Sequence, residues 1–246
     1  MVNNKSFFDA HAHAHEYHKD VEFYYRPLVT ILKNTVLPER ILDIGCGDGS
    51  FFKSITEEGI TTYYLGIDLS SSMIQSAMKN LINRDTNLIV ADVFRLPLVH
   101  YQQFDLIHID SVIHHLIGKT RSKSKELAKD VLDILFARLS KGGHIVVEEV
   151  YYESHITSGL TATVAFYGLK LINFLKLNLS SLSKVIYPGL EVNFYSEREL
   201  IKMLSQYGDV QVMKRIPYHN ERLHRLFLLK DQGHISFIIK KDRNAK

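Results

Sequence analysis

A glycine-rich stretch is the part of this sequence best suited to bind a ligand. Three glycines alternate with other residues after a short apolar run, and an acid precedes them. Glycine allows a positive φ and lets a ligand approach the backbone closely. The residues that follow Ser50 predict a helix, and a helix N-terminus offers unpaired N–H groups. The expected contacts are Asp43, Gly45, Cys46, Gly47 and Gly49.

Three further acids, Asp68, Asp92 and Asp110, end later apolar runs. An acid about 20 residues after a glycine loop is the expected partner of ribose hydroxyls in nucleotide-binding α/β folds. Ligands of such folds bind outside the carboxyl ends of the strands. Each acid alone could equally be a helix cap or a turn residue. Together with Asp43 they form a series of four, and the series favours a binding site.

The glycine spacing differs from the dinucleotide fingerprint Gly-x-Gly-x-x-Gly. The third glycine of that fingerprint would stand where this sequence has Ser50. The spacing therefore counts against an NAD-dependent oxidoreductase, and so does the segment around Asp92. A glycine-rich turn that binds no ligand also stays compatible with the triplet alone.

Five segments, in order along the chain, resemble the motifs of class I S-adenosylmethionine-dependent methyltransferases of the small-molecule type. The resemblance covers about residues 38–150. It implies an α/β fold with a doubly wound, seven-stranded, mostly parallel sheet of the Rossmann-like kind, whose last strand is antiparallel, and a helical lid insertion. It also implies S-adenosyl-L-methionine as the cofactor. The five segments are residues 42–49, 66–70, 91–97, 104–116 and 139–143.

The resemblance also implies roles for single residues. Asp68 would accept hydrogen bonds from both ribose hydroxyls, and Asp43 would hold the aminoacyl end directly or through water. Asp92 or the amide of Val93 would meet the adenine edge. The apolar walls of the adenine site would be Leu69 and Met73. A protein that binds this cofactor without transferring a methyl group fits the same residues.

Methyl transfer depends mainly on holding the acceptor, the methyl group and the sulfur in line. An alcohol, phenol or carbon acid also has to lose a proton. His114 and His115 follow Asp110 by about one helical turn, and histidine titrates near neutral pH, so they are the candidate general bases. Both could instead pack against the sheet. The second choices at the end of the fifth strand are Glu148, Glu149 and Tyr151.

Composition bounds the remaining possibilities. The chain has 246 residues, of which 46% are hydrophobic, and one domain over residues 1–246 is the natural expectation. A formal charge of +3 gives no case for a nucleic-acid partner. The single cysteine, Cys46, excludes an intrachain disulfide and fits a cytoplasmic location. Neither a secretory signal nor a membrane span is predicted, and the oligomeric state stays open.

Hydrophobic periodicity, glycines and prolines predict the secondary structure. Helices are expected over residues 22–36, 51–58, 71–82, 122–139 and 196–207, the last beginning with a capping box from Ser196 to Glu199. Strands are expected near residues 41–44, 63–67, 88–90, 104–110, 145–147, 210–216 and 235–240, and residues 223–229 stay ambiguous.

The chain is expected to divide into four parts: an N-terminal helical cap (1–37), a cofactor-binding core (38–150), a lid that selects the substrate (151–195), and a C-terminal helix with strands (196–246). In the cap, Tyr17 and His18 would help to wall the substrate pocket. The neighbouring histidines could hold a metal by their spacing alone, but no acid or cysteine partner is obvious, and we predict no metal.

The lid carries apolar residues at near-helical spacing through residues 156–182. This stripe, which includes Leu171 and Leu175, could pack on the body of the domain as a mobile lid. Part of it could also line an apolar acceptor pocket, or rest on a membrane surface. The last two possibilities predict a small apolar or lipid-like methyl acceptor, such as a prenylated quinone precursor, a sterol or a fatty acid.

Overall fold

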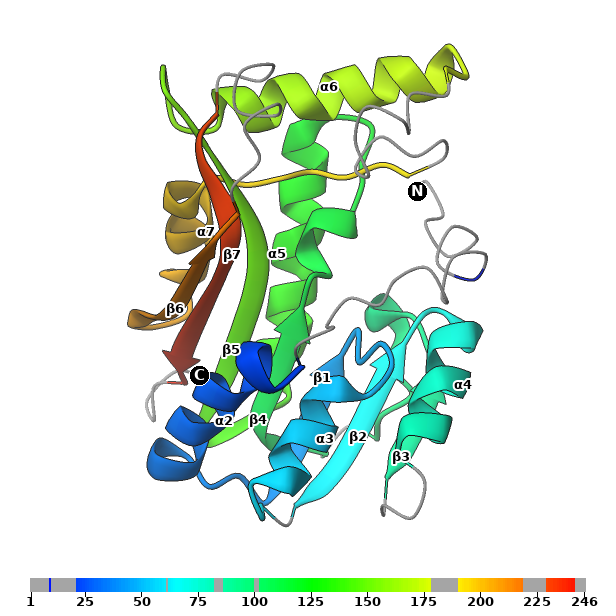
Figure 1. The fold of residues 1–246 in the computed structure, drawn as a ribbon, viewed down its shortest axis with the longest axis vertical. Helices are drawn as coiled ribbons and strands as arrows, with labels where there is room; N and C mark the ends of the chain where they lie inside the picture. Colours follow the sequence, from blue (N-terminus) through cyan, green and yellow to red (C-terminus); the bar gives the residue numbers. More distant parts are fainter. Residues whose placement is uncertain are drawn as a thin grey trace.

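The fold is organised around one seven-stranded sheet with the strand order β3-β2-β1-β4-β5-β7-β6. The computed structural model describes residues 9, 21–60, 62–81, 86–99, 102–177, 190–218 and 229–241. β7 runs antiparallel to both of its neighbours, and β1 to β5 pair in parallel. The expected doubly wound α/β fold with an antiparallel last strand is therefore confirmed (Figure 1).

The strands and helices lie close to where periodicity predicted them. The strands are Arg40–Ile44 (β1), Tyr63–Asp68 (β2), Asn87–Val90 (β3), Phe104–Asp110 (β4), Leu139–Ser154 (β5), Val210–Pro217 (β6) and Leu229–Lys240 (β7). The helices are Val21–Thr35 (α2), Ser50–Glu57 (α3), Ser71–Asn80 (α4), Arg121–Ala137 (α5), Leu160–Phe174 (α6) and Glu197–Leu204 (α7), with the 3-10 turns Val93–Arg95 (η1) and Ile113–His115 (η2).

Two layers of helices bury the sheet. One hydrophobic cluster joins α2 and α3 to one face, with Leu32, Phe51 and Tyr64 fully buried or nearly so. A second cluster joins α5 and α7 to the opposite face, around Leu132 and Leu200. The strand order reverses between β1 and β4, so a crevice for a ligand is expected at the carboxyl ends of these two strands.

Local capping fixes where two of the helices begin. The hydroxyl of Ser70 accepts a hydrogen bond from the Met73 amide at the start of α4. At the start of α7, Ser196 and Glu199 form the predicted capping box. Residues 223–228 lie outside the described residues, and Leu229 already belongs to β7.

β5 is longer than its apolar core of residues 145–147 predicted. It pairs with β7 as far as Ser154, because the antiparallel partner satisfies the backbone beyond Val150. Tyr151 also forms a bridge with Tyr195. The chain therefore leaves the sheet after residue 154 and not at 151, and α6 follows this extension. Among the described residues, no helix is both long and apolar enough to cross a membrane.

Candidate functional site

The glycine loop between β1 and α3 has a backbone that only glycine adopts easily. The φ angles of Gly45, Gly47 and Gly49 are 71°, 54° and 81°. A Cβ atom at Gly45 would lie 2.3 Å from Cγ2 of Val112, and one at Gly49 would lie 2.7 Å from Cδ1 of Leu81. Gly45 and Gly49 therefore let the loop pack tightly against two neighbouring segments.

Asp68, at the end of β2, lies directly beside this loop. One carboxylate oxygen accepts the Gly47 amide at 3.1 Å, and the other accepts the Ser70 amide at 2.8 Å. Burial raises the pKa of Asp68 to about 6, although the two amide bonds act in the opposite direction. A carboxylate at this place, next to open backbone, fits the hydroxyls of a ribose. Asp9, from the expected N-terminal cap, accepts the Ser70 hydroxyl at 2.7 Å and so lies near this site.

Asp43 lies beneath the loop and already has protein partners on both oxygens. The hydroxyl of Tyr64 donates to it at 2.5 Å, and Nδ1 of His108 lies 2.8 Å from its other oxygen. Its side chain is 1% exposed, so it supports the loop from below. Contact of Asp43 with an aminoacyl group stays a prediction. Burial raises the pKa of the Cys46 thiol well above its usual value, which keeps this thiol protonated.

The residues predicted for the adenine side lie along the ends of β2 and β3. Leu69 is 42% exposed and Met73 is buried in the first turn of α4. Asp92 caps η1, where its carboxylate accepts the Phe94 amide at 3.0 Å, and Val93 is buried beside it. Asp92 thus acts as a helix cap, and its contact with the adenine edge stays a prediction.

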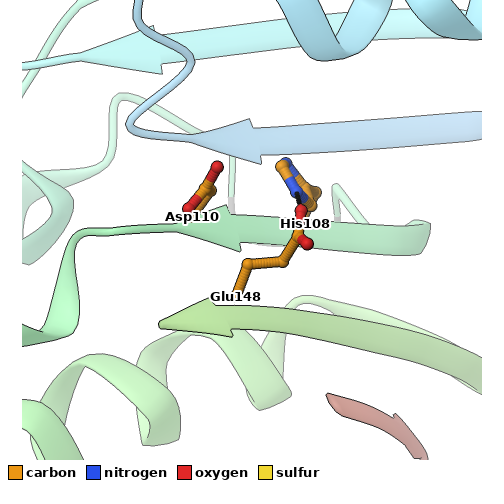
Figure 2. A group of neighbouring side chains, drawn as sticks. All are labelled: His108, Asp110 and Glu148. Carbon is orange, nitrogen blue, oxygen red and sulfur yellow. Dashed lines mark hydrogen bonds and ion pairs between the residues drawn. The ribbon is translucent and has the colours of Figure 1, made fainter. Parts of the chain in front are cut away.

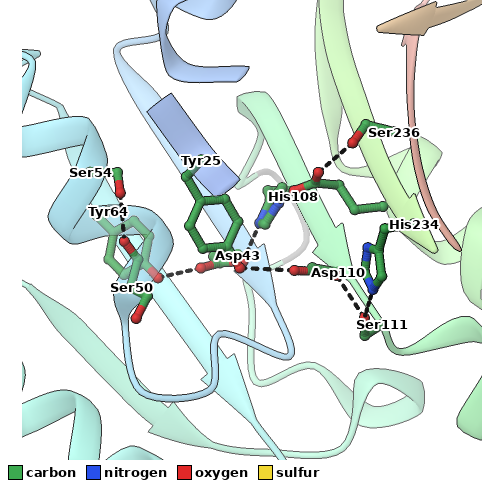
Figure 3. Close-up of polar contacts among 11 residues, drawn as sticks. Tyr25, Asp43, Ser50, Ser54, Tyr64, His108, Asp110, Ser111, His234 and Ser236 are labelled. Carbon is green, nitrogen blue, oxygen red and sulfur yellow. Dashed lines mark hydrogen bonds and ion pairs between the residues drawn. The ribbon is translucent and has the colours of Figure 1, made fainter. Parts of the chain in front are cut away.

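A buried polar chain crosses the sheet below the glycine loop (Figure 3). It runs from Tyr64 through Asp43, His108 and Glu148 to Ser236. Nε2 of His108 lies 2.9 Å from the Glu148 carboxylate, and the Ser236 hydroxyl donates to that same carboxylate. Burial by itself would lower the pKa of His108, but the two carboxylates raise it to about 10. His108 is therefore an imidazolium at neutral pH and donates from both ring nitrogens.

No pattern in the sequence marks His108 as a site residue. It stands between Ile107 and Ile109 in an apolar strand, where a histidine is easily taken for a packed side chain. The useful signal would have been the register of the sheet, which places His108 beside Asp43. That register depends on pairing between β1 and β4, and neither segment reveals it alone.

His108, Asp110 and Glu148 place one ligand atom each within 4.8 Å of one another (Figure 2). Such a trio could bind a metal ion, but its atoms already have protein partners. The Asp110 carboxylate accepts the hydroxyls of Tyr25 and Ser111, each at 2.8 Å. The imidazolium of His108 supplies the positive charge between two carboxylates. We therefore assign no metal to this cluster.

The structure brings together His114 and Glu149, two of the residues predicted for catalysis and for the acceptor pocket. Nδ1 of His114 lies 2.7 Å from the Glu149 carboxylate, which also accepts the Ile113 amide at 2.7 Å. When Nδ1 donates to this carboxylate, neutral His114 keeps a free lone pair on Nε2, as a general base requires. The ring of His115 lies 4.0 Å from that of His114, centroid to centroid.

The structure places several residues expected at the substrate differently from the prediction. Glu149 is fully buried under His114, so it supports that ring and does not form a pocket wall. Tyr151 is fully buried in the core and donates its hydroxyl to Asp231 at 2.8 Å. Leu171 and Leu175 lie on the outer side of α6, 57% and 53% exposed. Outside the described residues are Tyr17 and His18.

Two further residues near His114 had no signal in the sequence. The Asn193 amide donates to the His114 carbonyl at 2.8 Å, and the ring of Phe194 stacks 5.8 Å from the His114 ring. They belong to an irregular segment that returns beneath α6, and such a segment has no hydrophobic period to reveal it.

Known proteins match this chain in the region that forms the site. A family model described as a methyltransferase domain matches residues 38–208. Malonyl-[acyl-carrier protein] O-methyltransferase of Legionella pneumophila is 36% identical over 80 residues, which cover 32% of this chain and 28% of that protein. The tRNA U34 carboxymethyltransferase of Helicobacter hepaticus is 27% identical over 122 residues, which cover 47% of this chain and 36% of that protein. The chain thus spans well under half the length of these curated relatives.

The fold also resembles solved methyltransferases over nearly its whole length. The N-methyltransferase NodS of Bradyrhizobium japonicum, in complex with S-adenosyl-L-homocysteine, superposes with a TM-score of 0.60 at 14% identity, covering 97% of this chain and 98% of that chain. Magnesium protoporphyrin IX methyltransferase of Synechocystis, also with this product bound, gives 0.56 at 15% identity, covering 96% and 97%.

The glycine loop and Asp68 both lie inside the matched region. The motifs that suggested the resemblance are the same residues that form the loop, the acid beside it and the turn that carries His114. The chain therefore belongs to the methyltransferase domain family, and its fold is that of class I S-adenosylmethionine-dependent methyltransferases.

Proposed function

We propose that this chain transfers a methyl group from S-adenosylmethionine to a small, apolar acceptor in the cytoplasm. The observation that carries the cofactor part is the position of Asp68, which joins the glycine loop and the start of α4 through the amides of Gly47 and Ser70. The bound cofactor supplies an electrophilic methyl group on a positively charged sulfur. The protein's own residues bind the cofactor, orient the acceptor and accept the proton that the acceptor loses.

The charges below the loop suit a cationic ligand. Asp43, Glu148 and Asp110 bring three carboxylates close to one imidazolium, that of His108. The sum of these charges is negative at the carboxyl ends of β1 and β4. A sulfonium is favoured there over a neutral thioether, because opposite charges attract more strongly in a poorly solvated site.

His114 is our candidate for the group that removes a proton from the acceptor. Its bond to the buried Glu149 fixes the ring and directs the basic lone pair to Nε2. The same carboxylate stabilises the imidazolium that forms when Nε2 takes the proton. This arrangement supports an acceptor with an O–H or C–H bond to break, since an amine or thiol needs less help.

The test of this role is the His114→Ala variant. We expect kcat to fall about 100-fold or more and the acidic limb of the pH profile to disappear, because general-base catalysis typically contributes 10²–10⁴. Release of S-adenosylhomocysteine is the readout, with fatty acids, prenylated phenols and sterols as candidate acceptors.

The matched control is His115→Ala, which removes the neighbouring ring and leaves the His114–Glu149 pair intact. If kcat fell less than threefold in both variants, neither histidine would be the general base. Binding of S-adenosylmethionine without product release from any acceptor class would contradict turnover itself, and titration with NAD gives the matching negative control for the cofactor.

A further inference from the structure

Helix α6 carries apolar side chains on its outer side as well as on its buried side. Inward, Ala162 and Leu169 pack against Tyr152 and other residues of the β5 extension. Outward, five side chains follow one another at helical spacing, which places them on one side of the helix. They are Val164, Tyr167, Leu171, Phe174 and Leu175, with exposed fractions of 53%, 50%, 57%, 82% and 53%. We call these five residues the outer face of α6.

Single exposed apolar residues are ordinary on a protein surface, but a continuous group of this kind marks an interaction site. Leu177, two residues after the helix cap, is also 44% exposed. Helix α6 lies at one end of the long axis of the molecule (Figure 1), so its outer face can meet a flat surface along its length.

The charged residues around α6 indicate which kind of surface its outer face binds. The sequence has no aspartate or glutamate between Glu153 and Glu191, but it has Lys170, Lys176 and Lys184. Lys170 is paired with Glu191 at 2.9 Å, and Lys176 is exposed just after the helix. Because Glu191 neutralises Lys170, the positive charge at this face comes from Lys176. An apolar helix face that ends in an exposed lysine suits an anionic lipid headgroup layer.

We propose that the outer face of α6 lies on the surface of an anionic lipid bilayer, with its apolar side chains at the boundary between headgroups and acyl chains. The helix binds parallel to the membrane plane and does not span it. A second copy of the chain fits less well, because a stable dimer typically buries about 800 Å² per partner and one short helix face offers only a few side chains. This inference concerns binding and does not depend on the proposed acceptor.

The experiment is co-sedimentation of the purified protein with vesicles. One set is phosphatidylcholine alone, and the other contains about one-third phosphatidylglycerol. We expect the wild-type protein to bind the anionic vesicles more strongly. The Leu171→Ser/Phe174→Ser double variant should lower the partition coefficient about tenfold or more, because it removes apolar surface that would enter the membrane.

The matched control is Met78→Ser/Val212→Ser, which removes two exposed apolar side chains from α4 and β6, with 61% and 45% exposure. It should bind vesicles like the wild type. Lys176→Glu should weaken binding to anionic vesicles and leave binding to neutral vesicles nearly unchanged. Titration with S-adenosylhomocysteine shows that each variant keeps its fold.

Several results would overturn the proposal. The wild type could ignore both kinds of vesicle, or the double variant could bind as well as the wild type. Light scattering without lipid could also show that the wild type is a dimer and the double variant a monomer. In that case the outer face joins two copies of the chain.

Discussion

Asp68 is the single residue whose surroundings say most about the cofactor. It is the only carboxylate among the described residues that accepts an amide of the glycine loop and an amide at the start of the next helix together. Its buried position also raises its pKa to about 6, so its charge changes just below neutral pH. Two measurable effects follow, one from removing the carboxylate and one from protonating it.

We expect Asp68→Ala to weaken S-adenosylmethionine binding at least about tenfold, which corresponds to about 1.4 kcal/mol. In the wild type, affinity should also fall as the pH drops below about 6, because protonated Asp68 has lost acceptor capacity. Asp68→Asn should show a weaker affinity that no longer varies in this pH range. Calorimetric titration measures both effects.

Asp105→Asn is the control, because Asp105 is the second residue of β4 and lies at the opposite ends of the strands, where it accepts the Arg40 amide and the Ser140 hydroxyl. The affinity of this variant for S-adenosylmethionine should match that of the wild type at every pH. A folded Asp68→Ala protein with unchanged affinity would contradict the assignment of Asp68.

Local spacing placed the glycine loop between a strand and a helix, and Asp68 at the end of the next strand, because these elements lie within a few residues of one another. The partners of His114 and Asp43 could not be predicted in this way. Glu149 lies 35 positions after His114, and His108 lies 65 positions after Asp43. These pairs form only when the strands adopt their register, which sequence periodicity does not specify.

At the scale of elements, α5 and α7 are joined by ion pairs to one partly buried carboxylate, that of Glu199. Arg121 donates from both terminal nitrogens to the Glu199 carboxylate, at 2.6 Å and 2.7 Å. Lys125 reaches the same carboxylate from the exposed side at 2.6 Å. Burial would raise the pKa of Glu199, but the bonds from Arg121 and Lys125 lower it to about 2. Glu199 therefore stays charged across the whole physiological range.

We expect Arg121→Met to lower the free energy of unfolding by about 3 kcal/mol, because it leaves a partly buried carboxylate without its bidentate partner. Lys125→Met should cost less than about 1 kcal/mol, since its bond to the same carboxylate is exposed to solvent. Urea unfolding followed by circular dichroism measures both values. If both variants lost the same free energy of unfolding, burial would not explain the difference that we expect between these two contacts.

Periodicity placed the helices correctly but could not decide which side of α6 is buried. Both sides are apolar, so the stripe through Leu171 and Leu175 fitted a core, a pocket and a surface equally well. The structure buries Ala165 and Leu169 and leaves Leu171 and Leu175 exposed. The far end of β5 was missed for a different reason, since its length depends on pairing with β7 about 80 residues later.

At the scale of the whole molecule, the polar chain through His108 joins β1, β4, β5 and β7. Its members, Asp43, His108, Glu148 and Ser236, are all at most 3% exposed. The pKa of His108 is about 10 in the folded protein, against about 6.5 in an unfolded chain. A raised pKa stabilises the folded state fully below pH of about 6.5, and this contribution is lost as the pH rises through 10.

We therefore expect the wild-type protein to lose stability between pH of about 6.5 and 10 relative to a His108→Gln variant. At pH 6 the variant should be less stable by on the order of 2 kcal/mol, because it loses charged hydrogen bonds. Urea unfolding at several pH values gives the comparison, with His115→Gln as the control. Parallel pH curves for the wild type and His108→Gln would show that His108 is not the titrating group.

The bridge between Tyr151 and Tyr195 has a consequence for how this protein could diversify. The chain leaves the sheet after Ser154 and rejoins it at Tyr195, and the Tyr152 amide is bonded to the Tyr195 carbonyl at 2.9 Å. The two ends of this excursion are thus held together by the sheet, whatever lies between them. The entropic cost of closing a loop grows only slowly with its length. A longer, shorter or exchanged segment between these ends should therefore destabilise the cofactor-binding part of the domain only slightly. We therefore expect that insertions and exchanges between these two ends leave the methyl donor site nearly unchanged, provided that Asn193 and Phe194 keep their contacts with His114.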